Sequence, residues 1–283
     1  MVLSDLERER YARQMLVPEL GEAGQAKLLR SRVLVVGVGG LGSPALLYLT
    51  ACGIGEIGMM DGDSVEVSNL QRQILHGDSD VGRMKTASAV ETLRRLRSDV
   101  QVEVYPVRIS WDNASEIISR YDFVVEATDD FESKFIVNDA CVLQGKAFSH
   151  AGILGTCGQT MTVVPGRSPC YRCLFEDVPP AGAVETTHER GVLGSVAGVL
   201  GAIQATEAIK YLSGMGELLL GRLLTLDALT MTFREIALPT DQPCPVCLQA
   251  REGGSFLDRR NGCVATTTET HGSVLSGLSG KGV

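Results

Sequence analysis

The chain of 283 residues has no long apolar run, no leader-like N-terminus and no excess of basic charge. No uninterrupted apolar stretch reaches the ~20 residues that a membrane-spanning helix needs. The charged segment from Met1 to Arg10 leads into no apolar core of a signal peptide. Lys and Arg number 26 against 34 Asp and Glu, so the net charge is −8, whereas non-specific nucleic-acid binding needs a basic surface. These absences predict a cytoplasmic protein that binds neither membranes nor nucleic acids.

The composition and the order of the elements predict a folded α/β protein. Hydrophobic residues make up 44% and charged residues 21% of the chain, which excludes a mainly disordered protein. Short apolar runs alternate with helical patterns up to about residue 150, which is typical of βαβ units in a Rossmann-like, doubly wound parallel sheet. The expected strands are 32–37, 56–61, 102–107, 123–126 and 146–149, and the expected helices are 41–52, 84–97, 114–119 and 131–143.

The pattern changes after residue 150. A strand at 159–164, a polar loop at 178–191 and a Gly-rich helix at 192–212 are followed by two strands, 222–227 and 231–237. The last two strands are expected to pair antiparallel and to extend the sheet. We interpret residues 1–250 as one domain, with a nucleotide-binding half at about 30–150 and a second half at about 151–250. The Gly-, Ser- and Thr-rich tail, 251–283, is expected to be largely disordered.

A glycine-rich turn follows the first apolar strand and opens a helix. It contains Gly37, Gly39, Gly40 and Gly42 in the pattern G-x-G-x-x-G. These glycines allow a tight turn and close approach of the backbone to phosphate, and the helix N-terminus offers free N–H groups. Asp61 stands 19 residues after Gly42, at the end of the second strand, where an acid binds ribose. The sequence therefore predicts nucleotide binding, although this motif does not separate NAD from ATP.

Basic side chains after the second strand favour a triphosphate. A polar loop carries Arg72, and Lys85 opens the next helix. Cations here would neutralise the charge on β- and γ-phosphates, which a nicotinamide does not require. Asp129 and Asp130 follow the fourth strand, where a carboxylate is well placed to bind Mg²⁺. The alternative is that these two residues only cap the helix that starts near Phe131.

Four of the eight cysteines form two Cys-x-x-Cys pairs, Cys170 with Cys173 and Cys244 with Cys247. Four thiolates satisfy a tetrahedral zinc ion with no open position, which predicts a structural site. The alternative is a redox pair. A redox Cys-x-x-Cys normally opens a helix, whereas Pro169 and Pro245 suggest that these pairs lie in knuckle-like turns.

Several of these motifs, in this order, resemble the ThiF/MoeB/HesA family, the bacterial relatives of the ubiquitin-activating enzymes. The resemblance covers about residues 6–248. It rests on the segment around Arg13, the glycine-rich turn, Asp61, the run Ser68-Asn69-Leu70-Gln71-Arg72-Gln73, Lys85, Thr128-Asp129 and the cysteine pairs.

This resemblance implies an enzyme that uses ATP and Mg²⁺ to adenylate the C-terminal glycine carboxylate of a small ubiquitin-like sulfur carrier, which ends in Gly-Gly. Pyrophosphate is released and the carrier is prepared for thiocarboxylation. The second half would bind the carrier and zinc. The implied catalytic residues are Arg13, Arg72, Lys85 and Asp129, and the implied nucleotide-binding residues are Gly37, Gly39, Gly40, Gly42, Asp61, Ser68, Asn69, Leu70, Gln71, Arg72, Lys85, Asp129 and Asp130.

The resemblance also implies partners. A homodimer is expected, in which Arg13 reaches the second subunit's site; without the resemblance, Arg13 would be a solvated helix charge. The cysteine pairs and the short C-terminus favour the MoeB-like branch, hence a MoaD-like carrier before a ThiS-like one. About 35 residues follow Leu248, too few for a sulfurtransferase domain, so the sulfur donor is expected to be another protein.

The sequence departs from the family pattern at two positions. Asp130 stands where Asn often follows the metal-binding Asp, and Thr187 stands where many members carry a cysteine that links to the carrier. Threonine is a far weaker nucleophile than a thiolate, so we expect adenylation without a cysteine-linked intermediate in that loop. Cys157 and Cys263 are expected to be inert. Two alternatives stay open: an NAD-dependent oxidoreductase, and a non-catalytic scaffold that binds the carrier.

Overall fold

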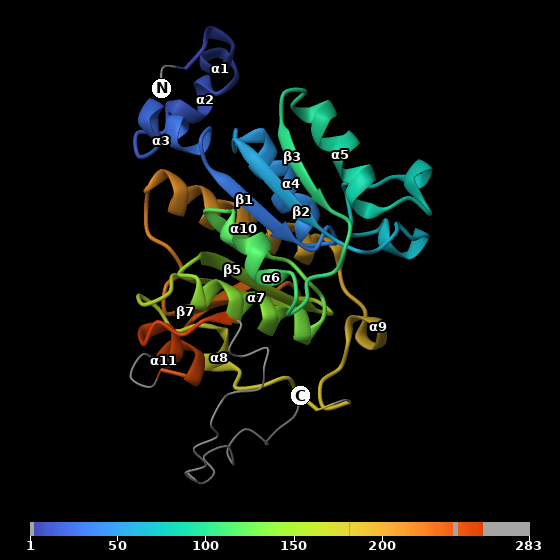
Figure 1. Cartoon of the computed structure of the whole chain (residues 1–283). Coiled ribbons are helices and arrows are strands. Elements are labelled where there is room, and N and C mark those ends of the chain that lie inside the picture. The colour runs from blue at the N-terminus through green and yellow to red at the C-terminus, as the bar shows by residue number, and fades with distance from the viewer. Residues whose placement is uncertain (1–2, 181, 240–242, 257–283) are drawn as a thin grey trace.

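The fold is organised around one sheet of eight strands. It is described here from a computed structural model that describes residues 3–180, 182–239 and 243–256. The strands lie in the order β3-β2-β1-β4-β5-β6-β7-β8 (Figure 1). They are β1 Arg32–Val36, β2 Glu56–Met60, β3 Gln101–Tyr105, β4 Phe123–Glu126, β5 Ala147–Leu154, β6 Cys157–Val163, β7 Arg222–Asp227 and β8 Thr232–Ala237.

The sheet has a parallel half and an antiparallel half. Strands β1 to β5 pair in parallel, and β6, β7 and β8 continue the sheet antiparallel from β5. Strands β1, β2 and β4 are apolar at nearly every position because helices cover both of their faces. The Rossmann-like sheet with an antiparallel extension, expected from the sequence, is confirmed.

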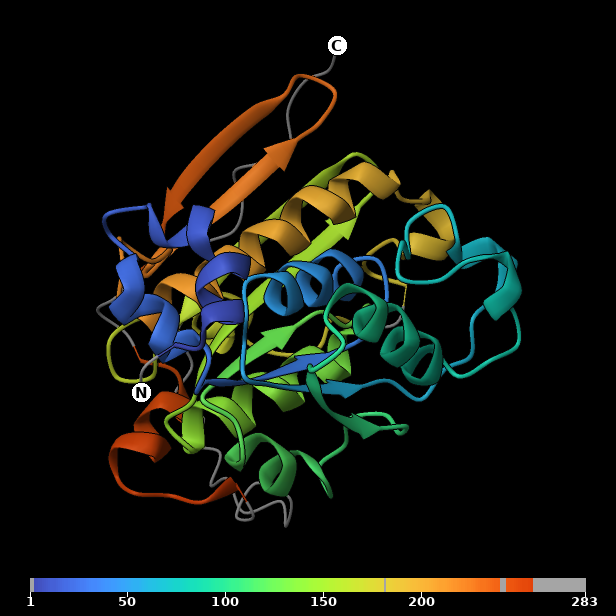
Figure 2. The ribbon, with the colours of Figure 1, turned by 90° about the horizontal axis from the view of Figure 1, so that it is seen from above.

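Helices cover the two faces of the sheet in separate groups. One core packs α3, α4, α5 and α10 against Val33 and Val35, and the other packs α6, α7 and α11 against Leu34 and Val36 (Figures 1 and 2). The helices are α1 Asp5–Arg10, α2 Ala12–Met15, α3 Gly21–Leu28, α4 Gly42–Ala51, α5 Lys85–Leu96, α6 Ala114–Ser119, α7 Phe131–Leu143, α8 Tyr171–Leu174, α9 Thr187–Arg190, α10 Gly194–Ser213 and α11 Pro245–Arg251, with 3₁₀ turns at Val67–Asn69 and Asp78–Asp80.

Glycine allows helix α10 to approach α4 closely. A Cβ atom on Gly201 would lie 2.3 Å from the carbonyl oxygen of Leu41 and 2.5 Å from the Pro44 ring. The N-terminal end of α4 is the glycine-rich turn, so α10 supports this turn from behind. In the described part of the chain, no helix has the length and apolar character needed to cross a membrane.

The structure corrects three expectations. Strand β5 continues to Leu154 rather than ending at residue 149, because β6 pairs with it from Phe148 to Leu154. The expected loop at 178–191 contains α9, whose first turn is closed by a capping box between Thr186 and Glu189. The disordered tail was expected from residue 251, but Phe256 is buried and stacks on Trp111. Residues 257–283 lie outside the described part.

Candidate functional site

A cavity of about 1100 Å³ lies at the carboxyl ends of the parallel strands. The segments that follow β1, β2 and β4 line one side of this cavity. Strands β6, β7 and β8 and the segment around α9 line the other side. The strand order reverses between β1 and β4, and the cavity lies beside the carboxyl ends of these two strands, where doubly wound folds bind their ligands. It extends from there to the antiparallel strands β6, β7 and β8.

The four motif glycines divide into two pairs. Gly37 has φ +98°, and a Cβ atom there would lie 2.5 Å from the Ala127 carbonyl oxygen. A Cβ atom on Gly42 would lie 1.9 Å from the Gly37 carbonyl oxygen. The turn itself therefore requires these two glycines. Gly39 and Gly40 line the cavity, and a Cβ atom on Gly39 would meet no atom closer than 3.6 Å. This second pair leaves the backbone accessible to a ligand, as phosphate binding requires.

Asp61 holds the glycine-rich turn from the end of β2. Its Oδ2 accepts a hydrogen bond from the Val38 N–H, and its Oδ1 accepts one from the Asp63 N–H, both at 2.8 Å. Burial raises the pKa of Asp61, and the nearby Lys85 ammonium opposes this shift. Asp61 also lines the cavity. The predicted ribose-binding residue therefore also shapes the turn.

Lys85 opens α5 and is almost fully buried. Its Nζ lies 3.0 Å from Asp63 Oδ2 and 3.8 Å from Asp61 Oδ2. The other Asp63 oxygen accepts a hydrogen bond of 2.6 Å from Arg108, whose side chain is 75% exposed. Lys85, Asp63 and Arg108 all line the cavity, so an anion entering it would meet two cations that share one carboxylate.

The predicted loop at residues 68–73 reaches the cavity only at its end. Arg72 lines the cavity and donates to the Ser68 carbonyl oxygen, and Gln73 lines it as well. Asn69 is buried, and its Oδ1 accepts a hydrogen bond from the Glu66 N–H. Ser68, Asn69, Leu70 and Gln71 are not among the residues that line the cavity. Their contact with a nucleotide stays a prediction.

The two carboxylates after β4 have different surroundings. Asp130 is the N-cap of α7, and its carboxylate accepts a hydrogen bond of 2.7 Å from the Ser133 N–H. Asp129 is exposed and lines the cavity. Among the described residues, no hydrogen-bond donor reaches its carboxylate. The capping interpretation is therefore confirmed for Asp130, while Asp129 keeps its oxygens available to a cation.

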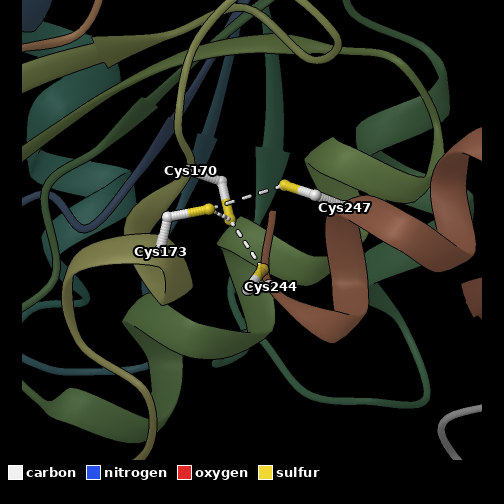
Figure 3. A group of neighbouring side chains, drawn as sticks. All are labelled: Cys170, Cys173, Cys244 and Cys247. Carbon is white, nitrogen blue, oxygen red and sulfur yellow. Dashed lines mark hydrogen bonds between the residues drawn. The ribbon is translucent and has the colours of Figure 1, made fainter. Parts of the chain in front are cut away.

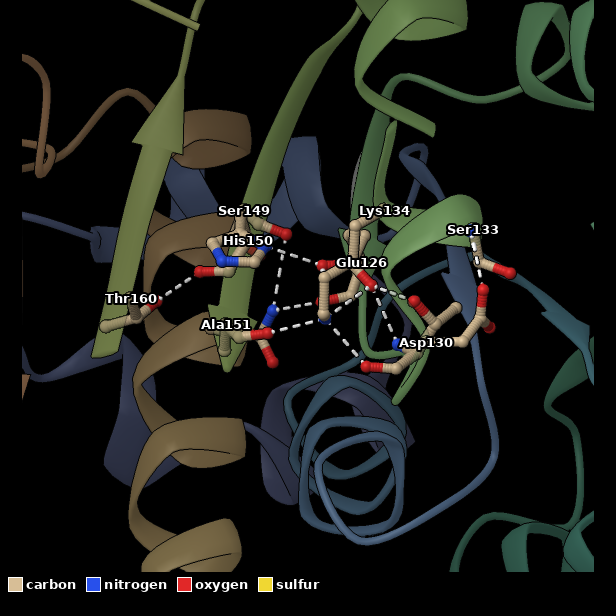
Figure 4. Close-up of polar contacts among 10 residues, drawn as sticks. Glu126, Asp130, Ser133, Lys134, Ser149, His150, Ala151 and Thr160 are labelled. Atoms are coloured by element: carbon tan, nitrogen blue, oxygen red, sulfur yellow. Dashed lines mark hydrogen bonds and ion pairs between the residues drawn. The ribbon is translucent and has the colours of Figure 1, made fainter. Parts of the chain in front are cut away.

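A buried network of charged side chains lies at the end of β4, close to the Asp130 cap of α7 (Figure 4). Glu126, Lys134 and His150 are each less than one tenth exposed. Lys134 Nζ lies 3.1 Å from Glu126 Oε2, and His150 Nδ1 lies 2.7 Å from the same oxygen. Burial raises the pKa of Glu126, but Lys134 and His150 outweigh it and lower the pKa to about 2. Burial lowers the pKa of His150, which favours the neutral imidazole; a neutral ring would donate its Nδ1 proton to the ionised carboxylate.

The four paired cysteines converge into one cluster (Figure 3). Their Sγ atoms all lie within 4.8 Å of one another, and the Cys170 and Cys173 sulfurs are 3.8 Å apart. A tetrahedral zinc site with bonds of about 2.3 Å separates its sulfurs by roughly 3.8 Å. The cluster therefore has the donor set and the size of a closed zinc site.

The expectation that both cysteine pairs lie in knuckle-like turns was wrong. Cys170 is the N-cap of α8 and Cys244 is the N-cap of α11, so both pairs open helices rather than forming simple turns. Helix N-termini stabilise thiolates by their partial positive charge. The convergence of four thiols, and not the absence of helices, is what favours a metal over a redox pair.

A comparison with known families identifies the chain. The ThiF family profile matches residues 11–246. This chain belongs to the ThiF family. The resemblance inferred from the motifs is therefore confirmed.

Curated relatives and solved structures agree with this assignment. The chain is 47% identical to the SAMP-activating enzyme E1 of Haloferax volcanii, covering 87% of this chain and 90% of the relative. It is 46% identical to the sulfur carrier protein adenylyltransferase of Thermus thermophilus, over 85% of this chain and 91% of the relative. It also covers 51% of the adenylyltransferase and sulfurtransferase MOCS3-1 of Zea mays at 45% identity. E. coli MccB in complex with MccA-N7isoASN shares the fold, with a TM-score of 0.76, 24% identity and coverage of 87% and 75%.

Three residues singled out in the ThiF-type sequence lie in distinct places. Thr187 begins α9 and lines the cavity, as does Cys157 at the start of β6. Arg13 is exposed on α2 and is not among the residues that line the cavity. The N-terminal helices α1, α2 and α3 precede the first residue of β1 (Figure 1), whereas the cavity is lined by the last residue of β1 and the glycines that follow it. Arg13 therefore has no contact with the cavity of its own chain.

The motifs of the ThiF family did not reveal four side chains of this site: Arg108, Glu126, Lys134 and His150. Of these four residues, only Glu126 could have been recognised from the sequence. It ends a strand that is otherwise wholly apolar, and a carboxylate at the buried end of such a strand needs a cationic partner. Lys134 and His150 supply that partnership from α7 and β5, which the sequence did not bring together.

Proposed function

We propose that this chain adenylates the C-terminal carboxylate of a small ubiquitin-like sulfur-carrier protein, using ATP and Mg²⁺ and releasing pyrophosphate. The observation that carries the proposal is the cavity, in which the glycine turn, Arg72, Lys85 and Asp129 meet. Near-full-length relatives named as a sulfur carrier adenylyltransferase and a SAMP-activating enzyme support the same chemistry.

The residues suit activation without a protein nucleophile. A carboxylate is a poor electrophile, and joining it to AMP as a mixed anhydride makes it open to attack by sulfur. The carrier carboxylate attacks the α-phosphate in line and displaces pyrophosphate, so catalysis rests on positioning and charge stabilisation. The free N–H groups at Gly39 and Gly40 would hold phosphate oxygens, and Lys85 and Arg72 would balance the charge of the departing pyrophosphate.

Asp129 would hold Mg²⁺, and when bound this ion would neutralise charge on the ATP phosphates. The residues fit such an ion because Asp129 offers an exposed carboxylate at the cavity. The cysteine cluster would hold Zn²⁺ as a structural ion. A homodimer would bring Arg13 of one subunit to the cavity of the other, and a separate protein would donate sulfur.

The carrier is proposed to be MoaD-like, with a ThiS-like carrier as the next candidate. The test is ATP–pyrophosphate exchange with Mg²⁺, measured without a carrier and with each carrier in turn. Exchange that depends on one carrier supports adenylation and identifies the pathway. ATP binding without exchange with either carrier would contradict this substrate class. Tight binding of NAD but not ATP would favour an oxidoreductase instead.

A further inference from the structure

Lys134 ties together the ends of two neighbouring strands. Its Nζ donates to the Thr128 carbonyl oxygen just after β4 at 2.7 Å and to the Ala151 carbonyl oxygen in β5 at 2.9 Å. Both carboxylate oxygens of Glu126 lie within 3.2 Å of the same nitrogen. An ammonium group has three protons, so these acceptors occupy its full donor capacity.

Glu126 fixes the same segment from the other direction. Its Oε1 accepts hydrogen bonds from both the backbone N–H and the hydroxyl of Thr128. Its backbone carbonyl oxygen accepts one of 2.7 Å from Gln204 on α10. Thr128 is therefore held through its N–H, its hydroxyl and its carbonyl group by one buried ion pair.

Asp129 lies between two anchored neighbours. Thr128 precedes it, and Asp130, the N-cap of α7, follows it. The backbone on both sides is thus fixed, while among the described residues no donor holds the Asp129 carboxylate. Such an arrangement supports the backbone and leaves the ligand atoms for a bound group, as the outer contacts of metal sites do.

We propose that Lys134 is a positioning residue, which aims the Asp129 carboxylate into the cavity by holding the Thr128 carbonyl group. This inference rests on the proposed function only in taking Asp129 as the ligand of a divalent cation that accompanies ATP. Apolar residues of similar volume often replace a buried ion pair without loss of stability. Stability alone therefore does not explain why Lys134 and Glu126 both bond to Thr128.

The test compares two lysines that make similar contacts at opposite ends of the sheet. Lys146 Nζ donates to the Ser119 and Tyr121 carbonyl oxygens, both at 2.8 Å, next to the first residue of β5 and away from the cavity. Lys134→Met and Lys146→Met each remove such a bridge, and Lys134→Arg retains the charge and the donors. The readout is the affinity for Mn²⁺, measured by electron paramagnetic resonance on the full chain with a non-hydrolysable ATP analogue, together with the affinity for the analogue without metal.

We expect Lys134→Met to weaken Mn²⁺ binding about tenfold to a hundredfold while the metal-free affinity for the analogue changes far less. Lys134→Arg should recover most of the Mn²⁺ affinity, and Lys146→Met should leave it unchanged. Wild-type Mn²⁺ affinity in folded Lys134→Met, or an equal loss in Lys146→Met, would overturn the proposal.

The double variant Lys134→Met with Glu126→Gln provides a second test if Lys134→Met does not fold, because it leaves no buried carboxylate without its cation. It still removes the donor to the Thr128 carbonyl oxygen and should weaken Mn²⁺ binding about tenfold to a hundredfold, and unchanged affinity would overturn the proposal. These measurements need no carrier, so they stand even if pyrophosphate exchange fails. In that case the function is wrong, and the role of Lys134 is judged separately.

Discussion

Two clusters of charged side chains lie at the same edge of the sheet and differ in almost every physical respect. Behind β4, Glu126, Lys134 and His150 are buried and hydrogen-bonded to one another and to strand ends; we call them the buried cluster. After β2, Asp63 and Arg108 are 41% and 75% exposed, and Asp63 contacts both Arg108 and Lys85; we call these three residues the open cluster. The buried cluster supports the architecture of the site. The open cluster has partners that a ligand can replace, because exposed ion pairs contribute little to stability.

The largest effect is expected where the two clusters meet, at Asp129. Asp129→Ala should reduce pyrophosphate exchange about 100- to 1000-fold, because charge on the phosphates loses its counterion site. Asp130→Ala is the matched control and should mainly cost stability, about 1 kcal/mol, through loss of the α7 cap. Exchange rates and thermal unfolding of both variants check this prediction. Wild-type exchange in Asp129→Ala would contradict the assignment.

The next effect concerns the stability of the buried cluster. Glu126→Ala leaves the Lys134 ammonium buried without its carboxylate and should lower the free energy of unfolding by about 3 to 5 kcal/mol. Urea denaturation measures this change. A loss below about 1 kcal/mol, the range of exposed pairs, would mean that the cluster behaves like the open one.

The contrast also explains how much could be predicted from the sequence. The apolar runs specified the strands, and the glycine turn, Asp61, Lys85 and Asp129 stood in motifs tied to strand ends. The parallel sheet brought these ends together, so their convergence followed from the fold class. Lys134 and His150 belong to no local motif. Their roles depend on the alignment of β4 with β5, and Glu126 pairs with His150 in that register, which no single segment encodes.

The cysteine cluster extends the comparison, because a zinc ion held there would be a third way to hold distant segments together. Tyr171 lies between Cys170 and Cys173, and its ring packs 4.4 Å from the His150 ring. Removal of metal with a chelator should therefore lower the thermal stability. It should also change the fluorescence of Trp111, the chain's one tryptophan, which stacks on Phe256 just after α11. Unchanged fluorescence and unfolding temperature after verified metal loss would contradict a clamping role.

A smaller effect is expected from pH. Burial lowers the pKa of His150 and of His76 in the folded chain, so the unfolded chain binds more protons below the usual histidine pKa of about 6.5. Stability should fall as the pH drops from about 7 to 5, by at most about 1.4 kcal/mol per pH unit for each histidine. Glu126, with a pKa of about 2, stays ionised and adds nothing in this window. In His150→Gln, the free energy of unfolding measured by urea denaturation should fall less steeply between about pH 7 and pH 5 than in the wild type. An unchanged pH dependence would contradict the buried neutral imidazole.

The smallest effect is expected in the open cluster, at Asp63. This prediction distinguishes the open cluster most clearly from the buried one. Lys85 Nζ lies 3.0 Å from Asp63, and under the proposed function ATP would draw this ammonium toward its phosphates. Asp63→Asn removes the competing charge but keeps the size of the side chain. It should tighten ATP binding a few-fold and change the free energy of unfolding by less than about 1 kcal/mol. Calorimetric titration with ATP and Mg²⁺ measures the first and urea denaturation the second. Weaker ATP binding would mean that Asp63 orients Lys85 for the nucleotide, so that the open cluster, like the buried one, is a fixed part of the site.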